Sequence, residues 1–228
     1  MRSEYPNPKD RKMNKLQTVI ASAVLALGVN SASQAQFSLP SVPGIKALGG
    51  SSSGGDIVGQ QDGLVRGYVA ANKDVLDANS LMANALGLKT EAATSAATSA
   101  ALTEGATKDA IEESNKVVAT STNAVAAEMA KKPVLDAKSK ALYGKGLILL
   151  ASGVTKFAGV GKNVSTMGSS LKSVSPLQLP KLQSAVYIVS NFPDSMTNVS
   201  GALKNAVSFA QSQDIPVPTD ANDALKAL

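Results

Sequence analysis

The chain of 228 residues contains no cysteine, no histidine and no tryptophan, and aromatic residues make up only 4% of it. Without cysteine no disulfide can form, and without thiolate or imidazole ligands the usual zinc, haem and iron–sulfur sites are excluded. The same absences exclude catalysis by Ser–His–Asp and Cys–His arrangements. Any chemistry would have to use carboxylate, lysine, tyrosine, serine or threonine side chains.

The N-terminal region has the pattern of a secretory signal peptide. Basic residues precede an apolar run over 19–29, and Ser33 and Ala35 are the small residues expected at positions −3 and −1 of a cleavage site. This run is too short to span a bilayer about 30 Å thick as a helix. We therefore predict a signal peptide in 1–35, with its start at Met13 and cleavage after Ala35. A buried N-terminal helix is the alternative.

Most of the positive net charge belongs to this predicted signal peptide. The full chain has 22 basic and 17 acidic residues, a net charge of +5. Residues 1–35 contain five of the basic and two of the acidic ones, which leaves 17 basic and 15 acidic residues, a net charge of +2. The net charge of the exported chain therefore gives no argument for binding nucleic acid.

Three segments follow the predicted signal peptide. Residues 36–59 are rich in glycine, serine and proline, which predicts a flexible linker because such a sequence buries little apolar area. The helical periodicity of 60–213 predicts one helical domain. Residues 214–228 contain two closely spaced prolines, which predicts an extended tail, followed by a short terminal helix with Asp220 as its N-cap.

The first helix is predicted over 60–86. Tyr68, Val75 and Met82 recur every seven residues, with alanine at the intervening positions of the same seam. Because alanine is small, a second helix can approach this seam closely. Gly87 can adopt the left-handed conformation that ends a helix.

The second helical region is predicted over 89–132. Twelve of the fourteen residues in 90–103 are alanine, serine or threonine. Gly105 can kink or divide this helix, and the sequence leaves that choice open. Pro133 closes the region because proline cannot continue the helical hydrogen bonds.

The remaining helices are predicted over 134–161, over 177–192, and from Asp194, which would cap a helix that starts after Pro193. No segment alternates apolar and polar residues in the manner of a strand. The predicted fold class is therefore all-α, as an elongated antiparallel bundle of long Ala/Ser/Thr-rich helices. The 134–161 helix has a clear apolar face formed by Tyr143, Leu147, Leu150, Val154 and Phe157.

Charge is unevenly distributed along the helical domain. Residues 131–181 hold nine lysines and one acid, whereas residues 56–130 hold ten acids and five bases. In one interpretation the two regions neutralise each other within the fold. In the other, a lysine-rich surface beside an apolar helix contacts anionic lipid or another polyanion. The candidate contact residues are Lys138, Lys145, Lys156 and Lys162.

Three short motifs match ligand-binding or catalytic patterns only in part. Gly159–Asn163 lacks the first glycine and the final Ser/Thr of a phosphate-binding loop and is interpreted as a helix end. Ser169–Lys172 matches Ser-x-x-Lys, but its companion motifs are absent. Asp109, Glu112 and Glu113 are interpreted as a solvated helix face, because metal sites in helical bundles usually add histidine. No catalytic, cofactor-binding or metal-binding residue is predicted.

These observations predict an exported, non-enzymatic helical protein of the bacterial periplasm or exterior, acting as a structural, adaptor or binding module. The alternative is a membrane-surface or lipid-binding protein that uses the lysine-rich helix. Nucleic acid is not an expected partner, because Arg66 is the only arginine after Ala35 and the two aromatics of the basic region, Tyr143 and Phe157, lie on its apolar face. No cofactor is expected. Because an alanine seam buries little area, we expect self-association or a protein partner.

Overall fold

The computed structural model describes residues 53–226, with side chains described from residue 57. The predicted signal peptide, and the linker up to residue 52, lie outside the described residues. Within them no strand occurs, so the all-α class is confirmed. The chain forms six α-helices and one short 3-10 helix: α1 (Ser53–Ala85), α2 (Lys89–Ala101), α3 (Lys108–Ala130), α4 (Ala137–Leu171), η1 (Leu179–Leu182), α5 (Gln183–Ser212) and α6 (Thr219–Lys226).

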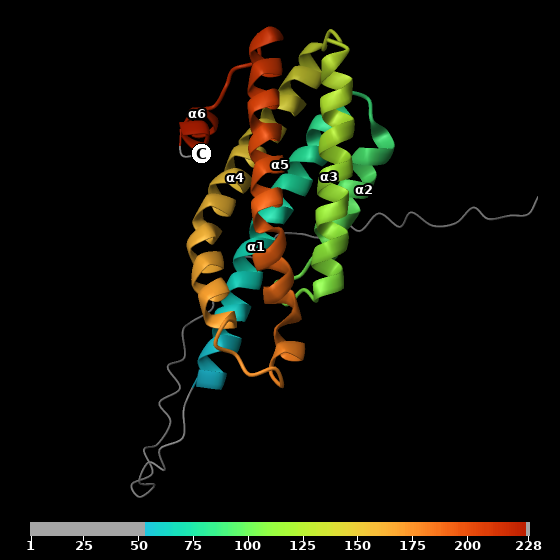
Figure 1. Ribbon diagram of the computed structural model, residues 1–228. Coiled ribbons are helices and arrows are strands. Elements are labelled where there is room, and N and C mark those ends of the chain that lie inside the picture. The colour runs from blue at the N-terminus through green and yellow to red at the C-terminus, as the bar shows by residue number, and fades with distance from the viewer. Residues whose placement is uncertain (1–52, 227–228) are drawn as a thin grey trace, which may run out of the picture. The chain divides into compact units, whose positions relative to one another are not determined.

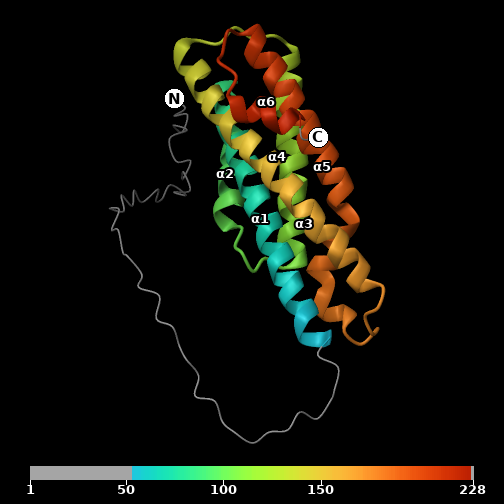
Figure 2. The same ribbon diagram turned by 90° about the vertical axis from the view of Figure 1, so that its left-hand side faces the viewer.

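Helix α1 is at the centre of the contacts between helices. It packs along α4 and also contacts α2, α3 and α5 (Figure 1). The long helices α1, α3, α4 and α5 lie side by side in both views, and the short helix α6 lies against α4 and α5 (Figure 2). The described helices therefore share one apolar core.

The contact between α1 and α4 is close because α4 presents glycine to the seam of α1. A Cβ atom at Gly146 would lie 2.7 Å from Cγ of Met82 and 3.0 Å from the carbonyl oxygen of Ala78. A Cβ atom at Gly153 would lie 2.7 Å from Cγ2 of Val75. The predicted seam is confirmed, since all its members on α1 are buried: Tyr68, Ala71, Val75, Ala78, Met82 and Ala85.

Two glycines stand between helices, one where the sequence predicts a helix end and one where it leaves the choice open. Gly87 has a φ of 82°, and the N–H of Leu88 donates to the carbonyl of Ala83 at 2.8 Å, which closes α1 with a left-handed cap. Gly105 lies in the turn between α2 and α3, so the second helical region is divided. Thr107 caps α3 with its hydroxyl, which accepts the Ala110 N–H at 3.3 Å.

Several predicted boundaries differ from the observed ones. Helix α4 begins at Ala137 where residue 134 was predicted, and α5 begins at Gln183 where residue 177 was predicted. Helix α1 begins at Ser53, before the predicted start at residue 60. Helix α4 continues to Leu171 through the glycines that were expected to end it near residue 161. A glycine inside a helix costs only about 1 kcal/mol. The apolar stripe of α4 continues beyond them, with Val160 and Met167 both buried, and this burial offsets the cost.

The prediction of two helices that meet at Pro193 is wrong. Pro193 lies inside α5, and Asp194 is therefore not an N-cap. Proline removes one backbone hydrogen bond and costs a helix about 3 kcal/mol. Here the buried stripe of Ile188, Val199 and Leu203 runs on both sides of the proline, so the core keeps the two halves in one helix.

After α5 the chain turns back onto α4. Asp214 has a φ of 53°, and the N–H of Ile215 donates to the carbonyl of Ala210 at 2.9 Å. Residues 215–218 are not helical, and α6 follows from Thr219. Its N-cap position is occupied by Pro218, whose carbonyl accepts the N–H groups of Ala221 and Asn222, so the prediction of Asp220 as the N-cap is wrong by two residues.

Candidate functional site

The four candidate lysines all lie on α4, and all four are exposed. A helix rises about 1.5 Å per residue, which separates Lys138 and Lys162 by roughly 36 Å along the axis. The structure therefore spreads these lysines along one helix and does not gather them into a single binding site.

Of the four candidate lysines, Lys156 forms an ion pair with another helix of the bundle. Its Nζ lies 2.7 Å from Oδ2 of Asp74 on α1. Ser152 Oγ donates to the same carboxylate oxygen at 2.5 Å. At this position the acidic first helix neutralises the basic one, as the first interpretation of the charge pattern proposes.

The C-terminal segment brings further acids to α4. One hollow is lined by Lys140 and Lys145 of α4 together with Asp214 and the 215–218 segment. A second hollow, between α4 and α6, places Asp220 and Asp223 beside Lys156. Lys138 and Lys162 have no ion-pair partner within the part of the chain that the structure describes.

A groove that the sequence did not indicate lies between the start of α3, the start of α5 and the segment before it. Its volume is about 760 Å³. Apolar side chains form much of its wall, and the half-buried Tyr187 of α5 stands in it. Its other lining residues include Lys108, Pro176, Leu179, Pro180 and Val186.

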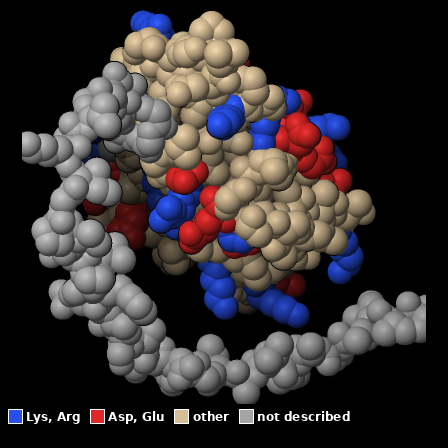
Figure 3. All heavy atoms as spheres, turned by 90° about the horizontal axis from the view of Figure 1, so that it is seen from below, with Lys and Arg blue, Asp and Glu red and all other residues tan. Residues whose placement is uncertain are grey.

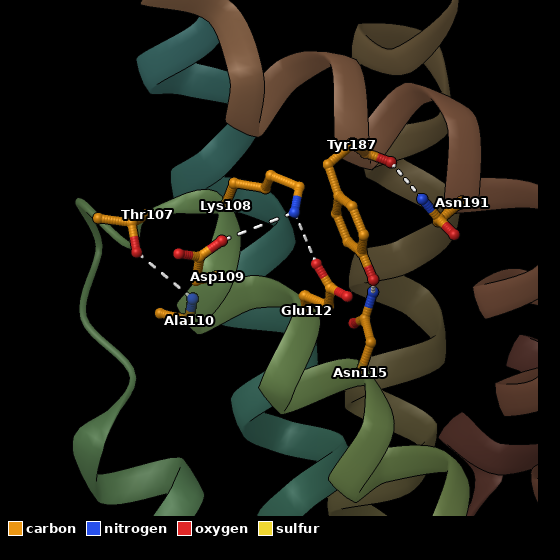
Figure 4. A network of polar contacts seen from close by, with 8 residues as sticks. All are labelled: Thr107, Lys108, Asp109, Ala110, Glu112, Asn115, Tyr187 and Asn191. Atoms are coloured by element: carbon orange, nitrogen blue, oxygen red, sulfur yellow. Dashed lines mark hydrogen bonds and ion pairs between the residues drawn. The ribbon is translucent and has the colours of Figure 1, made fainter.

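The charged groups at the edge of this groove are already paired. Lys108 Nζ donates to Glu112 Oε2 at 2.7 Å, lies 3.6 Å from a carboxylate oxygen of Asp109, and sits 5.7 Å from the centre of the Tyr187 ring (Figure 4). The hydrogen bond to Glu112 and the negative charge of that carboxylate raise the pKa of Lys108. Lys108 therefore stays protonated, and it faces two carboxylates, so the three groups together carry one net negative charge.

A hydrogen-bond network continues from Tyr187 into the core. Asn115 Nδ2 donates to the Tyr187 hydroxyl at 3.4 Å, while its Oδ1 accepts from the Tyr68 hydroxyl at 3.0 Å and from Asn72 Nδ2 at 2.8 Å. The Tyr68 hydroxyl is also 2.8 Å from Ser195 Oγ. Burial raises the pKa of Tyr68, and the hydrogen bonds with Ser195 and Asn115 offset part of that rise. The network joins α1, α3 and α5 and keeps its polar groups bonded to one another.

The partial motifs lie in ordinary helical surroundings. Gly159–Asn163 is inside α4, so it forms no loop. Ser169 Oγ donates to the carbonyl of Ser165 at 3.1 Å, and Lys172 occupies the C-cap of α4. Within residues 53–226, no group of three or more acidic side chains is arranged to hold a metal ion.

None of the helices described between residues 53 and 226 combines the length and the apolar character that crossing a membrane requires. Comparisons with known protein families, with curated proteins and with solved structures find no match for this chain.

Proposed function

We propose that this protein is an exported, non-enzymatic helical module that binds a protein partner in the bacterial cell envelope or exterior, as a structural or adaptor component. The groove around Tyr187 is the observation that supports this proposal best. The amine and carboxylate groups at its edge bond to one another, which leaves the apolar wall as its free contact surface. Such a surface suits binding better than proton or group transfer.

The finer architecture belongs to the same proposal. We take the long helices to form an elongated antiparallel bundle that follows a flexible linker. Export would remove residues 1–35 and release a chain that begins at Gln36, in the periplasm or outside the cell. A partner, or a second copy of the chain, would then cover apolar surface that the bundle leaves open.

The experiment is photocrosslinking in cells that export the protein. A benzophenone amino acid at Val186 should give a discrete adduct, and Leu179→Asp in the same chain should abolish it, because both residues line the groove. The matched control places the probe at Val134, an exposed residue away from the groove. Equal adducts at both positions, or none at Val186, would contradict the proposal. Mass spectrometry of the exported protein tests the predicted start at Gln36.

A second candidate function is binding to an anionic membrane surface through α4. Lys138, Lys145 and Lys162 are exposed and have no ion-pair partner among the described residues, which favours it. The test is the triple charge reversal of these lysines to Glu, with flotation on anionic and neutral vesicles. Lys156 is left unchanged, because a Glu beside Asp74 would also disturb the fold. Undiminished flotation on anionic vesicles would exclude this surface.

A further inference from the structure

We propose that the end loop, residues 172–182 between α4 and α5, contacts an anionic lipid bilayer by inserting Leu177 and Leu179. The inference rests on the second candidate function, but it places the lipid contact on residues other than the lysines of α4. Its surface is defined by the two leucines, the prolines beside them and the two lysines that flank them.

The end loop exposes apolar side chains that the core does not use. Leu177 is 88% exposed and Leu179 is 39% exposed. Pro176 and Pro180 stand beside them and are exposed as well, and Val186 of α5 continues the apolar surface along the groove wall. Contiguous exposed apolar residues of this kind mark a contact surface more often than single ones do.

The backbone holds the two leucines in a preformed turn. The N–H of Gln178 donates to the carbonyl of Ser175 at 2.9 Å, and the N–H of Lys181 donates to the carbonyl of Gln178 at 3.0 Å. Gln61 of α1 fastens the end of the loop, since its Nε2 donates to the carbonyl of Lys181 at 3.1 Å. Insertion would therefore not require the loop to fold first, which lowers the entropic cost of binding.

The charge of the loop favours anionic headgroups. Lys172 and Lys181 flank the leucines, are exposed and have no ion-pair partner in the described part of the chain. The sequence contains no acid between Asp136 and Asp194. Acidic and basic side chains are interspersed over this end of the helices (Figure 3), but the acids of the adjoining groove, Asp109 and Glu112, already face Lys108. The end loop itself carries two positive charges and no negative one.

The position of the loop favours a bilayer over a peptide. It stands at the end of the long helices, where α1 begins, in both views (Figures 1 and 2). A flat surface can reach the loop there without meeting the sides of the helices. The two lysines then lie at headgroup level, beside the apolar insertion, as in other interfacial contacts.

The absence of tryptophan from the chain gives a direct test. Leu177→Trp makes a single-tryptophan reporter in the full chain, and Val134→Trp is its matched control, because Val134 is 93% exposed in the turn between α3 and α4. With phosphatidylglycerol–phosphatidylcholine vesicles, the emission of the Leu177→Trp variant should shift to shorter wavelength and be quenched by brominated lipid. The control should change little. Adding Lys172→Gln and Lys181→Gln should weaken partitioning by about tenfold or more.

Three results would overturn the proposal. The first is no emission shift at position 177 with phosphatidylglycerol–phosphatidylcholine vesicles, and the second is an equal emission shift at both reporter positions. The third is an emission shift that appears without vesicles and grows with protein concentration. The last would make a second copy the occupant. Because the reporter is local, membrane binding through residues 1–35 cannot imitate the expected result. If flotation depends on the α4 lysines while the emission of the tryptophan at position 177 does not change, the second candidate function stands and the end-loop proposal fails.

Discussion

Helix α1 has two buried faces that use opposite means of packing. Toward α4, its alanines and the glycines of α4 remove side-chain bulk, so the backbones come close together. Toward α3, it presents buried amides. Asn79 Nδ2 donates to Ser121 Oγ at 2.8 Å and to Thr122 Oγ1 at 3.0 Å. Asn72 Nδ2 donates to Asn115 Oδ1 at 2.8 Å.

The difference separates two requirements of a bundle built from small residues. Close approach maximises dispersion contacts but gives little preference for one axial register, because small apolar residues resemble one another along the seam. The amides supply that preference, since a shift by one helical turn would leave them buried without partners. The α4 face therefore sets the distance between helices, and the α3 face sets their alignment.

The largest expected effect comes from adding bulk to the α4 face. Gly146→Val should destabilise the fold by about 3 kcal/mol, because its Cβ would meet the Ala78 carbonyl oxygen and Met82 at contact distances that force the helices apart. Urea unfolding followed by circular dichroism measures this change.

The matched control is Gly159→Ala in the same helix, where no atom lies within 4 Å of the added Cβ. It should stabilise the protein by up to about 1 kcal/mol, because alanine favours the helix and restricts the unfolded chain. Equal stability of the two variants would show that the α1–α4 contact is not limited by bulk.

A smaller effect is expected on the α3 face. Asn79→Leu should cost about 1–2 kcal/mol, since it removes the hydrogen bonds to Ser121 and Thr122 while keeping similar volume. The control, Asn84→Leu, changes an exposed position of the same helix and should stay within about 0.5 kcal/mol of the original. A stabilised Asn79→Leu protein would contradict a net stabilising role for this amide.

The smallest expected change in stability depends on pH and comes from Tyr68, which contacts both α4 and α3. Its ring packs edge-on against Phe157 of α4 with centroids 5.2 Å apart, and its hydroxyl bonds Asn115 of α3. Because burial raises its pKa in the folded protein, its contribution is fully present below about pH 10 and is lost as pH rises toward the folded pKa.

Tyr68→Phe should therefore cost about 1 kcal/mol at neutral pH, from the lost hydrogen bonds, and the gap to the original protein should narrow above about pH 10. Urea unfolding at several alkaline pH values measures that gap. Parallel stability curves for the two proteins would show that Tyr68 keeps an ordinary pKa after folding.

Sequence patterns predicted the features that depend on local periodicity. The heptad of Tyr68, Val75 and Met82 identified the buried seam of α1, and Gly87 was recognised as its end. The continuation of α5 through Pro193 was missed because local propensity argued for a break, whereas distant core contacts decided the outcome. The Lys156–Asp74 pair was also beyond prediction, since the partner lies on another helix.

The sequence by itself determined the helical class, the lack of cysteine and histidine chemistry, and the uneven charge, because composition and spacing act within one helix. Only the tertiary structure decided which lysines are neutralised, which glycines form a contact, and where a groove opens beside Tyr187. Those properties depend on which side chains from distant segments meet. The hydrophobic periodicity of one segment does not specify these contacts, because they form only when all the segments bury their apolar side chains in a common core.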